Sequence, residues 1–450
     1  MKRTFRHGIH PADGKAYTAD AAIRPFRPTG EAVYPLQQHI GAPAEPVVAV
    51  GDPVLVGQML AKPGGFVSAA VCSAVSGTVR AIEKRRTVTG QWVMSIVVDN
   101  DGAFTPLPEL SQPRDPAGLT AQQILDIIRD AGIVGQGGAG FPTHVKLTMK
   151  PGKAPDTVIV NGAECEPYLT SDYRMMLELP EELVGGLRVV LQLFPQARGV
   201  IAVEDNKPQA IRRLQEQAAG EARMAVLPLK TKYPQGGERM LIHAVTGRDI
   251  YSGCLPIDAG CVVLNVSTVI SIYRAVCRHI PQITTVMSIT GDGAAAPCNL
   301  AVPVGSSLTE VLEAGGGLRG EPEKLIAGGP MMGVAMVTTD VPATKTSSAI
   351  LAMSRDEVAA LEPTACIRCG RCVRACPESL VPVRLAQHAD ANDLDAFAAE
   401  GGMECMECGC CSYVCPARRR LTQSLKYGRS AVNAARRRKA AAKKETEGKA

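Results

Sequence analysis

Eight of the fifteen cysteines stand in two copies of one spacing, and this array constrains the fold more than any other feature. The first copy reads Cys366-x2-Cys369-x2-Cys372-x3-Cys376-Pro, and the second reads Cys405-x2-Cys408-x2-Cys411-x3-Cys415-Pro. This run is typical of domains that hold two [4Fe–4S] clusters. Three closely spaced thiolates bind one cube, and the fourth cysteine, before proline, binds the other cube.

The spacing therefore predicts two crossed sets of iron ligands. The first set is Cys366, Cys369, Cys372 and Cys415, and the second set is Cys405, Cys408, Cys411 and Cys376. The alternative is zinc or disulfides, but a zinc ribbon needs only four ligands per site and no x3-Cys-Pro ending. Cys410 is ambiguous because it adjoins Cys411, although only Cys411 keeps the spacing.

The 450 residues suffice for about three domains, and 46% hydrophobic with 21% charged residues is an ordinary soluble composition. The N-terminal residues form no apolar h-region, so we expect no signal peptide, and no apolar run reaches the ~18 residues that a membrane helix needs. We therefore expect a cytoplasmic chain, in which cysteines bind metal rather than form disulfides. The six remaining cysteines are expected to be buried apolar residues: Cys72, Cys165, Cys254, Cys261, Cys277 and Cys298.

The net charge of +5 is distributed unevenly. From Arg418 onward, twelve Lys or Arg face Glu445 and Glu447, a balance of +10, so the first 417 residues carry −5. The body is therefore not a nucleic-acid binder on charge grounds. The Ala/Lys/Arg-rich tail, residues 421–450, can form a solvated or frayed helix, or can bind an acidic partner or an anionic membrane leaflet.

Residues 1–110 are expected to form a β domain. Prolines make residues 1–40 irregular, and from about Glu45 to Asn100 short β-type runs alternate with Gly/Pro turns. The pattern resembles the lipoyl/biotinyl-type barrel sandwich. The turn Ser73–Gly77 has no lysine where such carriers hold a modified one, so we expect a structural or docking domain.

Residues 118–280 alternate strand and helix signals, which predicts an α/β domain. A helix over Thr120–Ala131 leads into a glycine loop, Gly135-Gln-Gly-Gly-Ala-Gly-Phe-Pro-Thr143. The loop contains GxGxxG, but a helix rather than a strand precedes it, so it is no Rossmann fingerprint. Bare amides and Lys146 can hold a phosphate, and the residues after the strand at Thr157 can bind a flavin or ribose. The alternative is that each loop is only a turn.

Four motifs in this order resemble the FMN- and NADH-binding subunit of respiratory complex I. They are Gly-x-Gly-Gly-Ala-Gly-Phe-Pro, Asn-x-x-Glu-x-Glu-Pro, Tyr-x-x-Gly-x-Glu and Asn-Val-x-Thr. The chain is more similar to the C subunits of Rnf electron-transport complexes. That resemblance extends from Phe5–Pro11, through Lys232–Gly247, to about residue 420.

Carried over by position, the resemblance implies a set of cofactor contacts. The implied FMN contacts are Gly135, Gly137, Gly138, Gly140, Lys146, Asn161, Tyr233, Gly236, Asn265 and Thr268. The implied NADH contacts are Phe141, Lys146, Glu164 and Glu166. The chain departs from the complex I subunit at Ala163, where that subunit has a carboxylate, and at Gly237, where it has a glutamate.

The implied fold is multidomain, α/β and α+β. After the β domain and the FMN/NADH domain come a β-grasp (soluble-ligand-binding) module at 281–340, with a helix over Ser307–Glu313, and a two-cluster ferredoxin domain at 355–420. Val341–Ala349 is expected to be a polar connector.

The resemblance implies an NADH-dependent electron-transfer subunit with FMN and two [4Fe–4S] clusters. Its partners would be the other Rnf subunits and, indirectly, ferredoxin, at the cytoplasmic face of the inner membrane. No catalytic acid, base or nucleophile is expected, because the cofactors hold the chemistry. Cutting the chain after Leu421 is expected to spare NADH oxidation but to weaken a salt-sensitive attachment to membranes. The alternatives are a soluble cobalamin reductase, which the N-terminal β domain disfavours, and a non-catalytic adaptor.

Overall fold

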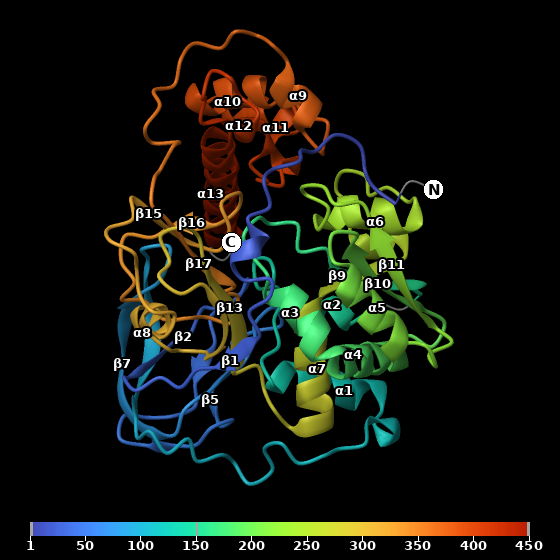
Figure 1. Ribbon diagram of the computed structural model, residues 1–450, viewed down its shortest axis with the longest axis vertical. Coiled ribbons are helices and arrows are strands. Elements are labelled where there is room, and N and C mark those ends of the chain that lie inside the picture. The colour runs from blue at the N-terminus through green and yellow to red at the C-terminus, as the bar shows by residue number, and fades with distance from the viewer. Residues whose placement is uncertain (1–2, 150–151, 448–450) are drawn as a thin grey trace.

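The computed structural model of the protein describes residues 3–149 and 152–447. Figure 1 shows the cysteine-rich C-terminal part, residues 355–447, at one end of the molecule; we call it the cluster domain. Below it lie a region of β-sheets on one side and an α/β domain on the other. The described residues include no helix with the length and apolar composition needed to cross a membrane.

The N-terminal domain consists of two small sheets, ordered β2-β8-β7-β4 and β3-β5-β6. Their strands are β2 (Ala32–Pro35), β3 (Glu45–Pro46), β4 (Pro53–Val54), β5 (Met59–Lys62), β6 (Val71–Cys72), β7 (Gly77–Arg86) and β8 (Trp92–Asn100). Strand β2 corrects the expectation that residues 1–40 are irregular. It pairs with β8, and its fully buried Tyr34 accepts a hydrogen bond from the Ala74 amide (2.9 Å).

The α/β domain is built on a parallel sheet of order β11-β10-β9-β12. Its elements are α1 (Ala121–Asp130), α2 (Thr143–Leu147), β9 (Thr157–Gly162), α3 (Ser171–Glu178), α4 (Pro180–Leu193), β10 (Arg198–Glu204), α5 (Pro208–Gln217), β11 (Met224–Leu229), α6 (Glu238–Thr246), β12 (Cys261–Asn265) and α7 (Val266–Arg278). The predicted helix at 120–131 is confirmed. Thr120 and Gln123 close a capping box, and Ile124 and Ile128 are buried.

The region that follows the α/β domain is built on a six-stranded sheet of order β1-β14-β13-β17-β15-β16. Its elements are β1 (Ile23–Pro25), β13 (Thr284–Thr290), β14 (Cys298–Pro303), α8 (Leu308–Ala314), β15 (Lys324–Ala327), β16 (Val334–Ala335) and β17 (Ala349–Met353).

This sheet corrects two expectations from the sequence. It extends beyond residue 340, because β17 lies between β13 and β15, and it takes β1 from the N-terminal segment. The expected polar connector at 341–349 is packed instead. Val341 and Ala343 belong to the hydrophobic core, and Lys345 is buried.

The cluster domain is made of short helices and one long helix. They are α9 (Arg371–Ala375), α10 (Pro382–Asp390), α11 (Leu394–Ala399), α12 (Cys410–Tyr413) and α13 (Leu421–Glu447). Helix α13 is not a free tail, because its Leu421, Leu425 and Val432 pack against the other helices of the domain. Residues 448–450 of the expected tail lie outside the described residues.

Candidate flavin and cluster sites

The candidate flavin crevice lies at the carboxyl edge of the parallel sheet. Strand β9 pairs with β10 on one side and with β12 on the other, so the chain changes direction across the sheet beside β9. Ligands of open α/β sheets bind at such a switch point, outside the carboxyl ends of the strands. Asn161 and Asn265 stand directly opposite each other there, in the last register pair of β9 and β12.

The glycine loop between α1 and α2 borders this crevice. It is pinned at its base by the Gly135 amide, which donates to the Phe141 carbonyl (2.8 Å). Gly137 has φ +72°, and a Cβ there would lie 2.9 Å from Asn265 Nδ2, whereas a Cβ on Gly138 would meet open space. No hydrogen bond to another described residue is recorded for the backbone amides of residues 137–140. These amides can therefore hold an anion.

A second layer of polar contacts fixes the loop and the strand ends. The Gln136 amide donates to Thr268 Oγ1 (3.0 Å), so Thr268 supports the loop from α7. Asn265 donates to Asp172 Oδ2 (2.7 Å) and also caps α7 by accepting from the Ser267 amide (2.8 Å). Asp172 was not predicted from the sequence. It is partly buried, and desolvation raises its pKa. Its position at the start of α3 was the available signal.

On the other side of β9, Asn161 donates to the Gly236 carbonyl (2.9 Å), and the Gly236 amide donates to Cys165 Sγ (3.3 Å). Lys146 lies 2.9 Å from Glu238 Oε1 and also donates to the Val263 carbonyl (3.0 Å). The Lys146 ammonium thus has a carboxylate partner in this structure.

The carboxylates expected to contact NADH have structural partners in this structure. Glu164 accepts from the Asp172 amide (2.7 Å), and its other oxygen lies 3.8 Å from buried Lys15. Burial raises the pKa of Glu164 to about 7. Glu166 accepts from the backbone amides of Met331 (2.7 Å) and Met332 (3.1 Å), which ties the strand end to the six-stranded sheet.

Two buried lysines hold the backbone of the loop that follows β9. Lys15 donates to the carbonyls of Glu166 (3.1 Å) and Leu169 (2.6 Å), and Lys207 donates to that of Ala163 (2.7 Å). Nothing in the sequence near either lysine indicated this role, because both contacts join distant segments.

Tyr233 lies between Glu166 and the second cysteine run. Its ring is buried, and its hydroxyl donates to the Cys408 carbonyl (2.7 Å). Arg239 pairs with Glu378 (3.1 Å) and Glu404 (2.7 Å) in the same junction. The second cysteine loop therefore packs directly against the α/β domain.

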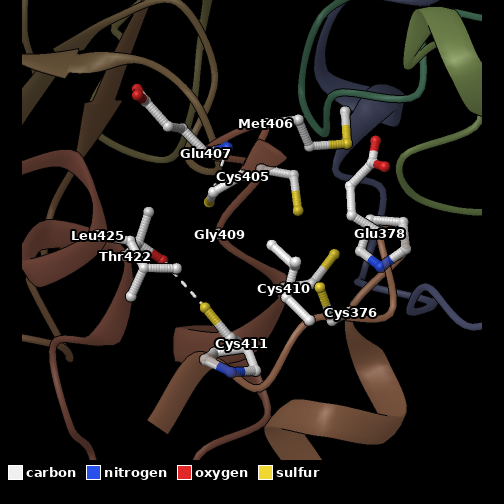
Figure 2. Close-up of a pocket in the computed structure, with 14 residues that line it drawn as sticks. Cys376, Glu378, Cys405, Met406, Glu407, Gly409, Cys410, Cys411, Thr422 and Leu425 are labelled. Atoms are coloured by element: carbon white, nitrogen blue, oxygen red, sulfur yellow. Dashed lines mark hydrogen bonds between the residues drawn. The ribbon is translucent and has the colours of Figure 1, made fainter. Parts of the chain in front are cut away.

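Figure 2 shows the cavity of the cluster domain in which Cys376 lies with Cys405 and Cys411. Cys408 and the fully buried Cys410 also line it, together with Thr422 and Leu425 of α13. Cys376 lies in the first cysteine run, and the fold brings it to the cysteines of the second.

The first-run cysteines lie on the outer side of this domain. Cys366 and Cys369 are exposed, while Cys372 and Cys415 are partly exposed and close enough to interact electrostatically. Of the six remaining cysteines, Cys254 is exposed and Cys165 half-buried, which corrects the expectation of burial for these two.

Both sites fit the cofactors that the sequence suggests. The glycine loop offers bare amides beside an open crevice, which suits a flavin phosphate. The cysteines supply eight thiols from two interleaved loops, which suits two cubes. Among the described residues, no three His, Cys, Asp or Glu side chains converge on one point as ligands of a single metal ion do. A [4Fe–4S] cube does not need such convergence, because each of its four irons binds one thiolate.

Three family descriptions match this chain. Residues 3–103 match the RnfC barrel sandwich hybrid domain, residues 128–274 the Nuo51 FMN-binding domain, and residues 359–416 the 4Fe-4S dicluster domain.

The chain is also similar to named proteins over most of its length. It is 41% identical over 434 residues to the C subunit of the Na+-translocating ferredoxin:NAD+ oxidoreductase complex of Acetobacterium woodii, covering 96% of this chain and 98% of that protein. It is 43% identical to the C subunit of the proton-translocating ferredoxin:NAD+ oxidoreductase complex of Clostridium ljungdahlii, covering 86% and 84%. It is 38% identical to the C subunit of the ion-translocating oxidoreductase complex of Rhodobacter capsulatus, covering 96% and 83%.

Proposed function

The chain belongs to the family of C subunits of ion-translocating ferredoxin:NAD+ oxidoreductase complexes, and from this membership we propose that it exchanges electrons with NADH inside such a complex. It carries an FMN-binding domain and a 4Fe-4S dicluster domain, which agrees with electron transfer as its task. The observation that supports the proposal best is the glycine loop at the crevice between β9 and β12, because no hydrogen bond to a described residue is recorded for its amides at 137–140.

When bound, FMN would supply two-electron chemistry toward NADH and one-electron chemistry toward the [4Fe–4S] clusters. The residues of this chain bind and orient. The amides of 137–140 would hold the flavin phosphate, with Lys146 near it, and the amides of Asn161 and Asn265 would face the flavin. Phe141, Glu164 and Glu166 would border the nicotinamide nucleotide.

The two sets of thiolates proposed as iron ligands are Cys366, Cys369, Cys372 with Cys415, and Cys405, Cys408, Cys411 with Cys376. The shared cavity of Cys376 and the second run supports this crossing. Burial raises the pKa of Cys376 to about 11, so iron binding must supply the energy to remove its proton.

The partners would be the membrane-bound and iron–sulfur subunits of the complex, and ferredoxin through them. The chain would be peripheral, on the cytoplasmic face of the inner membrane. The proposed module boundaries are 1–110, 118–280, 281 to the end of β17, which includes the β-grasp module, and 355 to α13.

Gly137→Val tests the flavin site in the full chain after reconstitution with FMN and iron. A β-branched residue at φ +72° is strained, and its side chain would collide with Asn265 and cover the amides. We expect FMN binding, measured by quenching of flavin fluorescence, and NADH oxidation with ferricyanide to fall at least roughly a hundredfold, since more than about 2.7 kcal/mol of phosphate binding is removed. Iron content should stay unchanged.

Gly51→Val is the matched control. Gly51 also has positive φ (+95°), but a Cβ there would meet no atom within 4 Å, and the turn lies in the N-terminal domain. It should bind FMN normally. Retention of flavin affinity and rate in Gly137→Val would contradict the site.

A further inference from the structure

The outer side of the cluster domain presents the first cysteine run to solvent. Cys366 and Cys369 are exposed, and Ile367 between them has 66% of its surface accessible. Residues 364–370 form no helix or strand, and α9 begins only at Arg371. The second cysteine run is not open to solvent in this way, because Tyr233 and Arg239 of the α/β domain pack against it.

Five arginines lie within five sequence positions of a first-run cysteine or of Cys415. All five are exposed, and no ion pair with any described residue is recorded for them: Arg368, Arg371, Arg374, Arg418 and Arg420. The Thr364 amide donates to the Ala417 carbonyl (3.0 Å), which holds the two arginine-bearing segments side by side. Neither residues 363–377 nor residues 411–421 contain an Asp or Glu. We call these five arginines with Ile367 the arginine face.

The second run differs in charge pairing as well. Its carboxylates Glu404 and Glu407 pair with Arg239 and Arg429, at 2.7 and 2.6 Å. The fold thus neutralises the charges around the inner cysteines and leaves those around the outer cysteines unpaired. Exposed charges of one sign gathered on one face attract a partner of the opposite sign.

We infer that the arginine face is the docking surface for an acidic electron-transfer protein; this inference rests on the proposed function. Arginine and large apolar side chains are enriched in the cores of protein interfaces, and unpaired charges of one sign steer a partner of the other sign. An anionic membrane is negatively charged as an acidic protein is, but it carries no redox group that could come close to the exposed cysteines. The position of Cys366 and Cys369 inside the face therefore favours a protein.

Two charge-reversal variants of the full chain test the surface: Arg368→Glu/Arg371→Glu and Arg418→Glu/Arg420→Glu. The second pair lies outside the cysteine runs, so it keeps the test valid if the first pair disturbs iron binding. The control is Arg24→Glu/Arg212→Glu, which makes the same charge change at two exposed arginines of other domains for which no ion pair is recorded. Iron content and the EPR spectrum establish that each protein holds its clusters.

The probe is a small acidic ferredoxin, which stands in for the acidic electron-transfer domain of an iron–sulfur partner subunit. Its binding is measured by fluorescence anisotropy in a salt series. Wild type should bind more weakly as salt rises, because screening shortens the attraction. Each reversal should weaken binding at least roughly tenfold and flatten the salt dependence, with the control within roughly twofold. Phosphatidylglycerol vesicles form the second arm.

Equal ferredoxin affinity of the reversals and the control would overturn the inference. So would loss of vesicle binding with ferredoxin binding intact, since that result assigns the face to a membrane. Neither result depends on flavin, so failure of the proposed function would show separately, as a wild-type chain that neither binds FMN nor oxidises NADH.

Discussion

The position of Cys376 decides how the two cubes are connected to the chain. Its thiol lies in the same cavity as Cys405 and Cys411, although its sequence neighbours are the exposed Cys369 and the half-buried Cys372. We predict that Cys376→Ala converts the second-run cluster to a [3Fe–4S] form or loses it, and spares the first-run cluster. Cys415→Ala should do the converse. EPR and iron content report both outcomes.

A double variant separates this arrangement from its alternative. If the ligand sets cross, Cys376→Ala with Cys366→Ala damages both clusters. One cube left fully intact would instead place Cys376 with its own run. Cys410→Ala is the control, because Cys410 is fully buried in the same cavity and is the thiol best placed to replace a missing ligand.

Among the elements, helix α13 packs against the cluster cavity, so its removal by a C-terminal truncation should affect the clusters. Thr422 and Leu425 line the cluster cavity, and Arg429 pairs with Glu407 (2.6 Å). A cut after Leu421 removes these contacts, and losing one buried leucine side chain alone costs about 2–5 kcal/mol. We predict that this cut lowers iron content and NADH-dependent cluster reduction, whereas a cut after Ala435 preserves both. Equal iron content in the two truncated proteins would contradict the packing role.

Elements whose signals are local could be predicted from the sequence. The capping box before α1 and the strand that ends at Asn265 are examples, since each depends on neighbouring residues. The glycine loop and the cysteine runs were visible for the same reason. The burial of α13 was not, because its apolar positions are sparse among charged residues that dominate the composition.

Pairings between distant segments could not be predicted. Strand β1 joins β14 across more than half of the chain, and β17 begins at the last residue of the stretch expected to be a polar connector. At the flavin crevice, the residues that were not predicted are those that come from distant parts of the chain. Lys15 supports the loop after β9 from the N-terminal segment, and only the fold reveals the contact.

For the whole molecule, Lys345 is the point at which three regions meet. It lies just before β17, and its ammonium donates to the carbonyls of Ala70 (2.5 Å), in the N-terminal domain, and Gly132 (2.6 Å), just before the glycine loop. The Gln136 side chain of that loop donates to the Lys345 carbonyl (3.2 Å). The ammonium is fully buried, and no ion pair with a described carboxylate is recorded for it.

Burial lowers the pKa of Lys345 from 10.5 to about 8. Between these pH values the folded chain has lost this proton while the unfolded chain keeps it, so this group makes stability rise with pH. Lys345→Met should be less stable at pH 7, because an unpaired buried carbonyl costs about 1–3 kcal/mol. The gap to wild type should widen by up to about 3 kcal/mol toward pH 10.5. Thermal unfolding measures it, with exposed Lys230→Met as control. Parallel pH curves for wild type and Lys345→Met would show that Lys345 ionises as an exposed lysine does.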